Sequence, residues 1–148
     1  MLRQGFLYQA PRSNNVVDMK VYAIEHVQLA MPPNGEEAAR SFYVGVLGLT
    51  EKPKPPRLAE RGGVWFEQGE LKIHLGVESD FRPAQKAHPA LLVEGLDELI
   101  IRCEEAGMPV VHDEPLDGFR RAYLNDPFGN RIELMEPVEA VPMKVGAQ

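Results

Sequence analysis

The sequence contains one cysteine, Cys103, so no disulfide bond can form within the chain. This usage suits a reducing compartment, and we predict a cytoplasmic location. No apolar run approaches the roughly 20 residues that span a bilayer. The opening residues also lack the apolar stretch of a secretory signal. We therefore expect no membrane partner.

Basic residues are fewer than acidic residues. The chain has 16 Lys and Arg against 22 Asp and Glu, a net charge of −6. Nucleic acids and anionic lipid surfaces need basic protein surface, so we predict neither as a partner. The 148 residues, 44% of them hydrophobic, suit one domain or two small fused modules. Thirteen glycines and 13 prolines favour many short elements joined by turns.

The first half of the chain predicts a strand, a helix and further strands. Apolar residues alternate over 24–31, which is typical of a strand with one buried face. An apolar stripe of helical period predicts a helix over 36–47, stopped by Gly48. A proline-rich bend follows. Two strands are then predicted over 63–68 and 71–77, with the turn Gly69-Glu70 between them.

After a polar linker the order of elements returns. The pattern predicts a helix over 96–106, and strands over 88–93, 109–112, 119–125 and 130–135. Cys103 falls on the apolar stripe of that helix, so we expect it to be a buried, small apolar side chain. We interpret the order as β-α-β-β-β, twice, with a period near 60 residues.

The predicted fold class is therefore α+β. Two tandem β-α-β-β-β modules, residues 22–78 and 87–137, are expected to form a cupped mixed sheet with the helices outside. Together they make one domain over 22–137, preceded by an N-terminal arm (1–21) and followed by a C-terminal tail (138–148). Each module is too small to bury a large core alone, so we predict a homodimer.

The repeat places four metal-ligand side chains at equivalent positions. His26 and His88 begin the first strand of each half and are 62 residues apart (88 − 26). His74 and Glu133 occupy the last strands and are 59 apart (133 − 74). Apolar neighbours flank both of them, so their side chains point away from the helices. Imidazoles with one carboxylate suit Zn, Fe, Ni, Co or Mn. We predict that His26, His88, Glu133 and His74 bind one divalent metal ion.

The alternative is that these are four polar members of a solvated sheet face. A lone surface histidine is more often that than a ligand, but coincidence must then explain the symmetric placement. His112 has no partner in the repeat, and we interpret it as structural. The strands that should line the cup also carry Trp65, Phe66, Arg121 and Tyr123. Which face these four occupy stays open.

Two stretches of the sequence resemble a known superfamily. The segments His26-Val27-Gln28-Leu29-Ala30, Ser41-Phe42-Tyr43 and Val46-Leu47-Gly48-Leu49 resemble the opening module of the vicinal-oxygen-chelate superfamily. That superfamily includes glyoxalases, bleomycin-resistance proteins, fosfomycin-resistance proteins and extradiol dioxygenases. The run from Asp126 to Leu134 resembles its final turn and strand, which end on a ligand glutamate. The resemblance spans roughly residues 22–137.

The resemblance implies that His26, His88 and Glu133 match the His, His, Glu triad of fosfomycin-resistance thiol transferases and extradiol dioxygenases. Glyoxalase I has a fourth ligand at the position of His74, commonly a glutamate, so this chain departs from that pattern. In the enzymes a divalent metal holds two neighbouring substrate oxygens and stabilises the enolate or alkoxide that forms.

Three functions remain open at this point. The first is a metal-dependent lyase, isomerase or thiol transferase that acts on a small oxygenated metabolite. The second is an extradiol-type dioxygenase. The third is a metal-free drug-binding resistance protein, and the acidic net charge is compatible with a cationic drug. No catalytic residue beyond the four ligands is assigned.

Overall fold

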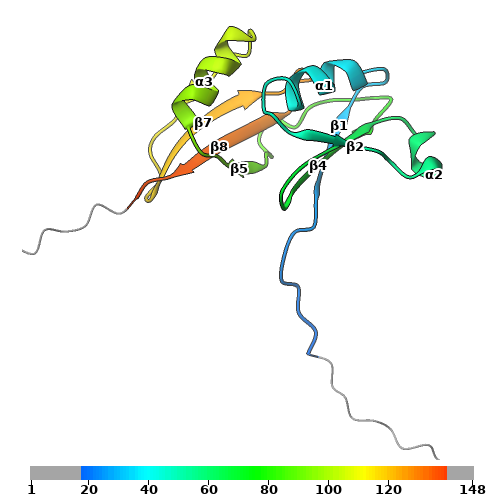
Figure 1. The fold of residues 1–148 in the computed structure, drawn as a ribbon, viewed down its shortest axis with the longest axis horizontal. Helices are drawn as coiled ribbons and strands as arrows, with labels where there is room; N and C mark the ends of the chain where they lie inside the picture. The colour runs from blue at the N-terminus through cyan, green and yellow to red at the C-terminus, as the bar shows by residue number, and fades with distance from the viewer. Residues whose placement is uncertain (1–17, 140–148) are drawn as a thin grey trace, which may run out of the picture.

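The computed structural model describes residues 18–139, which form two four-stranded sheets, each with helices on one side (Figure 1). The first module contains β1 (Val27–Met31), α1 (Glu36–Tyr43), β2 (Thr50–Lys52), α2 (Pro56–Ala59), β3 (Val64–Gln68) and β4 (Leu71–Val77). The second contains β5 (Ala90–Leu92), α3 (Leu96–Glu105), β6 (Val111–His112), β7 (Phe119–Asn125) and β8 (Arg131–Pro137).

The two sheets have the same topology. Their strand orders are β1-β4-β3-β2 and β5-β8-β7-β6. In each sheet the first and last strands of the module pair in parallel, and the other pairs are antiparallel. The long helices α1 and α3 lie on the same side of the molecule (Figure 1). The predicted α+β fold of two tandem modules is confirmed.

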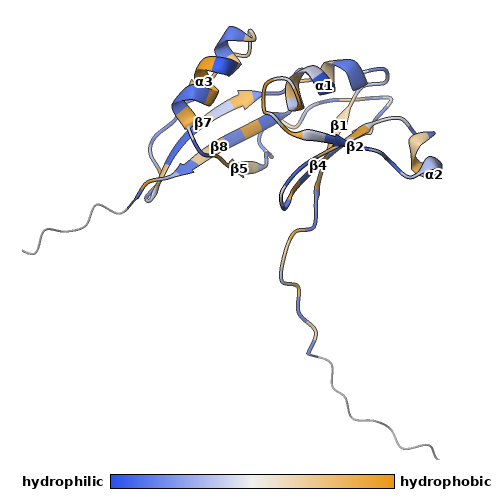
Figure 2. Cartoon of the chain, viewed as in Figure 1, coloured by the Kyte–Doolittle hydropathy of each residue, from blue (hydrophilic) through white to orange (hydrophobic). Residues whose placement is uncertain are grey.

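The helices close the core through amphipathic faces. In α1 the buried residues are Ala39, Phe42 and Tyr43, and in α3 they are Leu96, Ile100 and Cys103. Hydropathy alternates along α3, where hydrophobic and hydrophilic residues succeed one another (Figure 2). Cys103 is fully buried, as its place on the stripe predicted. The buried side chains of both modules belong to one hydrophobic cluster.

A buried polar tie joins the two modules. The Tyr43 hydroxyl of α1 donates a hydrogen bond of 2.8 Å to the Asp126 carboxylate, in the turn before β8. The Asn130 side-chain amide donates to Asp126 Oδ2 and to the Ala30 carbonyl of β1, each at 2.8 Å. Burial makes each bond costly to lose. The tie therefore fixes the turn that leads into β8 against the first module.

Two elements of the first module were not predicted. Strand β2 has only three residues, Thr-Glu-Lys, all exposed, so it carries no apolar alternation. It forms because its backbone pairs with β3. Helix α2 has one turn and lies where a proline-rich bend was expected; Pro56 stands at its start, where a proline costs no hydrogen bond. Strand β2 completes the β-α-β-β-β order.

Several predicted boundaries were wrong by a few residues. Strand β1 begins at Val27 rather than residue 24, because residue 24 would face the turn that precedes β4. Helix α1 ends at Tyr43, and hydrogen-bonded turns continue to Gly48. Strand β5 is shorter than 88–93, since Pro89 has no N–H to donate. Strand β6 lacks residues 109 and 110, whereas β8 runs to Pro137 because β7 pairs along its whole length.

The predicted arm and tail lie mostly outside the described residues. Of the arm, residues 18–21 are described, with Met19 and Val21 almost fully exposed. Of the tail, only residues 138 and 139 are described. Among residues 18–139, no helix has the length and apolar character that crossing a bilayer requires.

Candidate functional site

The strand register places the four predicted ligands at equivalent points of the two sheets. Gln28 of β1 is the register partner of His74, and Ala90 of β5 is the register partner of Glu133. His26 precedes Gln28 by two residues, and His88 precedes Ala90 by two residues. Side chains two residues apart on an extended chain share a face. Each histidine therefore lies beside the predicted ligand of the neighbouring strand.

The first pair belongs to an aromatic stack on the first sheet. The rings of His26 and His74 stack with centroids 4.3 Å apart and planes 20° apart. On its other side, His74 stacks against Trp65 of β3 at 4.2 Å, with planes only 8° apart. The two flanking rings leave the His74 residue only 7% exposed.

Charges around this stack act on both histidines. Glu25 accepts a hydrogen bond from Lys72 and lies 2.5 Å from Nδ1 of His26. These two contacts lower the pKa of Glu25 to about 2. Burial, and then the neighbouring His26, lowers the pKa of His74 below its ordinary value. His74 is therefore neutral at pH 7, the form that binds metals or accepts protons.

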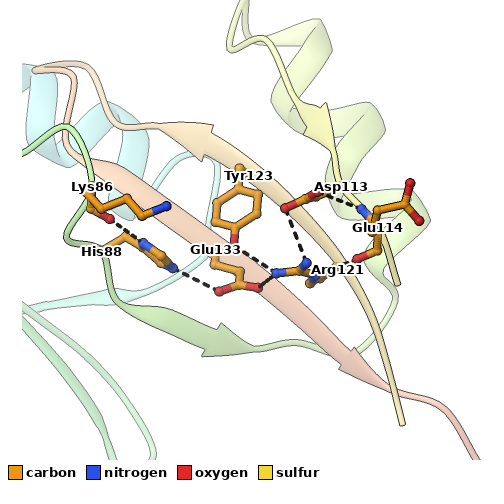
Figure 3. A network of polar contacts seen from close by, with 7 residues as sticks. All are labelled: Lys86, His88, Asp113, Glu114, Arg121, Tyr123 and Glu133. Carbon is orange, nitrogen blue, oxygen red and sulfur yellow. Dashed lines mark hydrogen bonds and ion pairs between the residues drawn. The ribbon is translucent and has the colours of Figure 1, made fainter. Parts of the chain in front are cut away.

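The second pair joins an imidazole to a carboxylate (Figure 3). Nε2 of His88 lies 3.1 Å from Oε2 of Glu133, a carboxylate that is only 6% exposed. Nδ1 of His88 contacts the Lys86 carbonyl oxygen at 2.8 Å, which fixes the ring orientation. Oε1 of Glu133 accepts a hydrogen bond of 3.2 Å from Nη1 of Arg121 on the next strand, β7.

Arg121 links this pair to further groups. Its Nη1 donates to the Tyr123 hydroxyl at 3.0 Å, and its Nη2 lies 3.3 Å from the Asp113 carboxylate. Burial works against ionisation of Glu133, but hydrogen bonds from Arg121, His88 and Tyr123 outweigh it, so the pKa of Glu133 is lowered. The carboxylate is thus ionised at neutral pH, as a metal ligand must be.

The structure brings the four residues together as two pairs, one on each sheet. Among residues 18–139 of one chain, no three His, Cys, Asp or Glu side chains are close enough to hold a metal ion. The donor set itself suits a divalent ion: imidazoles in contact with one another, and one buried carboxylate in contact with an imidazole. The residue types therefore suit a metal in chemistry, and the described part of one chain holds them as two separate pairs.

The surface of the described residues has hollows, and one of them shares Tyr123 with the surroundings of His88. A cleft of about 840 Å³ is lined by Tyr123, Arg131 and His112, among others, and another of about 670 Å³ lies between Leu47, Leu71 and Leu99. None of the four predicted ligands lines either of them. His112 is exposed on the two-residue strand β6.

The sequence left open which face of the sheets four further residues occupy. Phe66 is fully buried in the core, whereas Trp65 and Tyr123 contact the ligand pairs. Trp65 is the register partner of His74, and Tyr123 is that of Glu133. Their separation of 58 residues (123 − 65) matches the repeat and could have identified both. Arg121 has no such counterpart, because the equivalent residue is Gly63.

Comparison with known proteins agrees with this geometry. Residues 23–134 match the model of the Glyoxalase/Bleomycin resistance protein/Dioxygenase superfamily. A glyoxalase family protein from Bacillus anthracis is 45% identical, with a TM-score of 0.77 over 81% of this chain and 98% of its own. A lactoylglutathione lyase from Agrobacterium tumefaciens is 25% identical, with a TM-score of 0.59 over 80% and 96%.

An antibiotic-binding protein, TnmS3, from Streptomyces sp. CB03234 shares the fold at 22% identity, with a TM-score of 0.63 over 81% of this chain and 99% of its own. No curated protein sequence matches the chain significantly. Because the family model covers most of the chain and the first of these structures is similar in both sequence and fold, the chain belongs to the Glyoxalase/Bleomycin resistance protein/Dioxygenase superfamily.

Proposed function

We propose that the chain is a divalent-metal-dependent enzyme of the glyoxalase type, a lyase, isomerase or thiol transferase. Its substrate would be a small oxygenated metabolite held through two neighbouring oxygens. The contact between the buried Glu133 carboxylate and His88 carries this proposal. The equivalent positions of the other module hold His26 and His74, so both pairs consist of side chains that bind divalent metals. The Glu133 carboxylate is ionised, and an ionised carboxylate beside an imidazole is a donor pair that divalent cations bind in proteins.

In this proposal His26, His88 and Glu133 are the ligands, and His74 is a fourth ligand or a close neighbour. The two pairs lie on different sheets, and the described part of one chain gathers no three ligand side chains. We therefore propose that the active form is a homodimer, in which a second copy supplies the complementary pair. Three protein ligands leave positions open for substrate oxygens.

The metal, when bound, would supply Lewis-acid stabilisation of negative charge on the substrate oxygens. The chain supplies the rest. His74 is neutral at pH 7 and packs between Trp65 and His26, so its imidazole can accept a proton in a fixed orientation. The Tyr123 hydroxyl, held by Arg121, lies beside the carboxylate and can orient a substrate oxygen.

One observation favours a second candidate, a metal-free binding protein. The stack of Trp65, His74 and His26 offers a flat aromatic surface for a planar ligand. TnmS3, which has the same fold, is an antibiotic-binding protein, and this supports the same alternative. An extradiol-type dioxygenase is a third candidate, because His26, His88 and Glu133 occupy the sequence positions that resemble its His, His, Glu triad. Oxygen uptake with a catechol separates it from the first.

Metal analysis tests the proposal directly. Protein purified without added metal is analysed by elemental mass spectrometry, and binding of Mn²⁺, Zn²⁺ and Ni²⁺ is measured by calorimetry at neutral pH. We expect about one ion per ligand set, and a strong loss of occupancy for Glu133→Ala. His112→Ala is the matched control, since it changes an exposed histidine outside both pairs. A wild type that neither carries nor binds an ion would favour the metal-free binding protein instead.

A further inference from the structure

Arg121 is the one arginine in contact with a predicted ligand among the described residues. Its side chain is 18% exposed and lies between two carboxylates, with Glu133 at 3.2 Å and Asp113 at 3.3 Å (Figure 3). Its Nε donates to the Glu114 carbonyl at 2.8 Å. The guanidinium is thus held at Nε and Nη2 by the segment before β7, whereas Nη1 points toward Glu133 and the Tyr123 hydroxyl.

The charged side chains in contact with Arg121 and with the Tyr123 ring balance one another. Glu133 and Asp113 contribute two negative charges and Arg121 contributes one positive charge. The guanidinium of Arg131 lies 4.1 Å from the centre of the Tyr123 ring and supplies the second. A divalent ion on Glu133 would therefore leave an excess of about two positive charges around a buried carboxylate. Such an excess is unfavourable unless an anion joins it.

The donors of Arg121 show where that anion would lie. If Glu133 binds a metal, Nη1 of Arg121 loses its strongest acceptor. The guanidinium keeps its hydrogen bond to the Glu114 carbonyl and its ion pair with Asp113. Nη1 and the neighbouring Tyr123 hydroxyl then form a ready pair of donors next to the metal ligand. A carboxylate is the acceptor that matches a guanidinium best, in geometry as well as in charge.

We propose that Arg121, with the Tyr123 hydroxyl, recognises an anionic group of the substrate, so that the substrate carries a carboxylate beside its two chelating oxygens. This inference rests on the proposed function. Arg121 would be the residue that determines specificity for acidic over neutral metabolites. It would also compete with the metal for Glu133 until the anionic substrate arrives.

Two probes with the same chelating group test the proposal. Acetohydroxamate is a two-oxygen chelator without a carboxylate, and malonic acid monohydroxamate adds one carboxylate to it. Binding of each to the Mn²⁺-loaded protein, and of Mn²⁺ itself, is measured by calorimetry for the full chain. The variants are Arg121→Met and Arg121→Gln, the second of which keeps a hydrogen-bond donor for Glu133.

Arg120→Met is the matched control. Arg120 is the next residue of the same strand, but it points to the other face and pairs with Asp97 and Glu136 near the start of α3. Its loss removes the same charge from the protein without touching the ligand pairs. Any effect of net charge alone will therefore appear in both variants.

For wild type we expect tighter binding of the carboxylate-bearing probe than of acetohydroxamate. Either Arg121 variant should weaken that probe about tenfold or more, as loss of a charged hydrogen bond does. Acetohydroxamate should change less than threefold, and Mn²⁺ should bind at least as tightly, because a competing cation is gone. A purely structural role predicts the opposite, a loss of all three affinities together.

Two kinds of failure are distinguishable. If wild type binds no Mn²⁺, or binds acetohydroxamate equally well without Mn²⁺, the proposed function fails and this inference fails with it. If both bind as expected but the carboxylate brings no gain, or Arg120→Met loses as much as the Arg121 variants, only the role of Arg121 is overturned.

Discussion

The substitution Tyr43→Phe removes a single oxygen from the tie between the modules. The Tyr43 hydroxyl donates to Asp126 at 2.8 Å, and both residues are almost completely buried. The ring would keep its stacking on Phe66, with centroids 5.1 Å apart. Asp126 would also keep its other donors, the backbone N–H groups of Phe128 and Asn130 and the Asn130 amide. The change therefore isolates one hydrogen bond to a charged acceptor.

Such a bond contributes about 1.5–3 kcal/mol. Because three donors to Asp126 remain, we expect a loss near the lower end, about 1.5–2 kcal/mol. For a chain of this size that corresponds to a fall in Tm of roughly 3–8 °C. Urea unfolding followed by circular dichroism measures the free energy, and the m-value should not change.

Tyr22→Phe is the matched control for this measurement. Tyr22 is 85% exposed, so the same chemical change should cost less than about 0.5 kcal/mol there. If Tyr43→Phe also costs less than that, the buried tie does not stabilise the folded protein. The statement that it fixes the turn before β8 against the first module would then be wrong.

Four further outcomes are expected. Burial, and then the Asp126 carboxylate, raises the pKa of Tyr43 well above its ordinary value, whereas the unfolded chain ionises this phenol near pH 10. The contribution of Tyr43 to stability is therefore intact below about pH 10 and falls above it. Tyr43→Phe should remove that part of the fall in alkaline urea titrations. Gly63→Ala should lower the free energy of unfolding by more than about 1 kcal/mol, since φ is +84° and a Cβ would lie 2.2 Å from the Leu75 carbonyl oxygen. Cys103 is fully buried and burial raises the pKa of its thiol, so Ellman's reagent should label it only on unfolding. Light scattering at tens of micromolar should give the mass of a dimer, and a monomer would contradict the shared site.

The fold was largely accessible from the sequence because apolar periodicity reports directly on burial. The stripe through Cys103 predicted the buried face of α3, and the alternation through Ile73 and Leu75 predicted β4 within its observed bounds. Strand β2 escaped because all three of its residues are exposed and only backbone pairing defines it. The same limit explains the boundary of β1, which the neighbouring strand sets rather than its own residues.

The site was accessible only in part. Pseudo-symmetric spacing selected His26, His74, His88 and Glu133, and the register of the two sheets agrees with it. Spacing gives no information on how the two sheets of one chain face each other, so the separation into two pairs could not be predicted. That these residues bind a metal stays a prediction.

The backbone itself explains why Arg121 has no counterpart in the first module. Its equivalent in the first module is Gly63, which precedes Trp65 by two residues as Arg121 precedes Tyr123. Gly63 has φ +84°, and a Cβ there would meet the Leu75 carbonyl oxygen at 2.2 Å, so the position excludes every side chain. The first module therefore has no side chain at this position beside its histidine pair, and the charged groups near that pair, Glu25 and Lys72, come from other positions. Only the second module can place a guanidinium at this position, where it hydrogen-bonds the predicted ligand carboxylate Glu133. The two otherwise equivalent sheets therefore differ in charge at the proposed site.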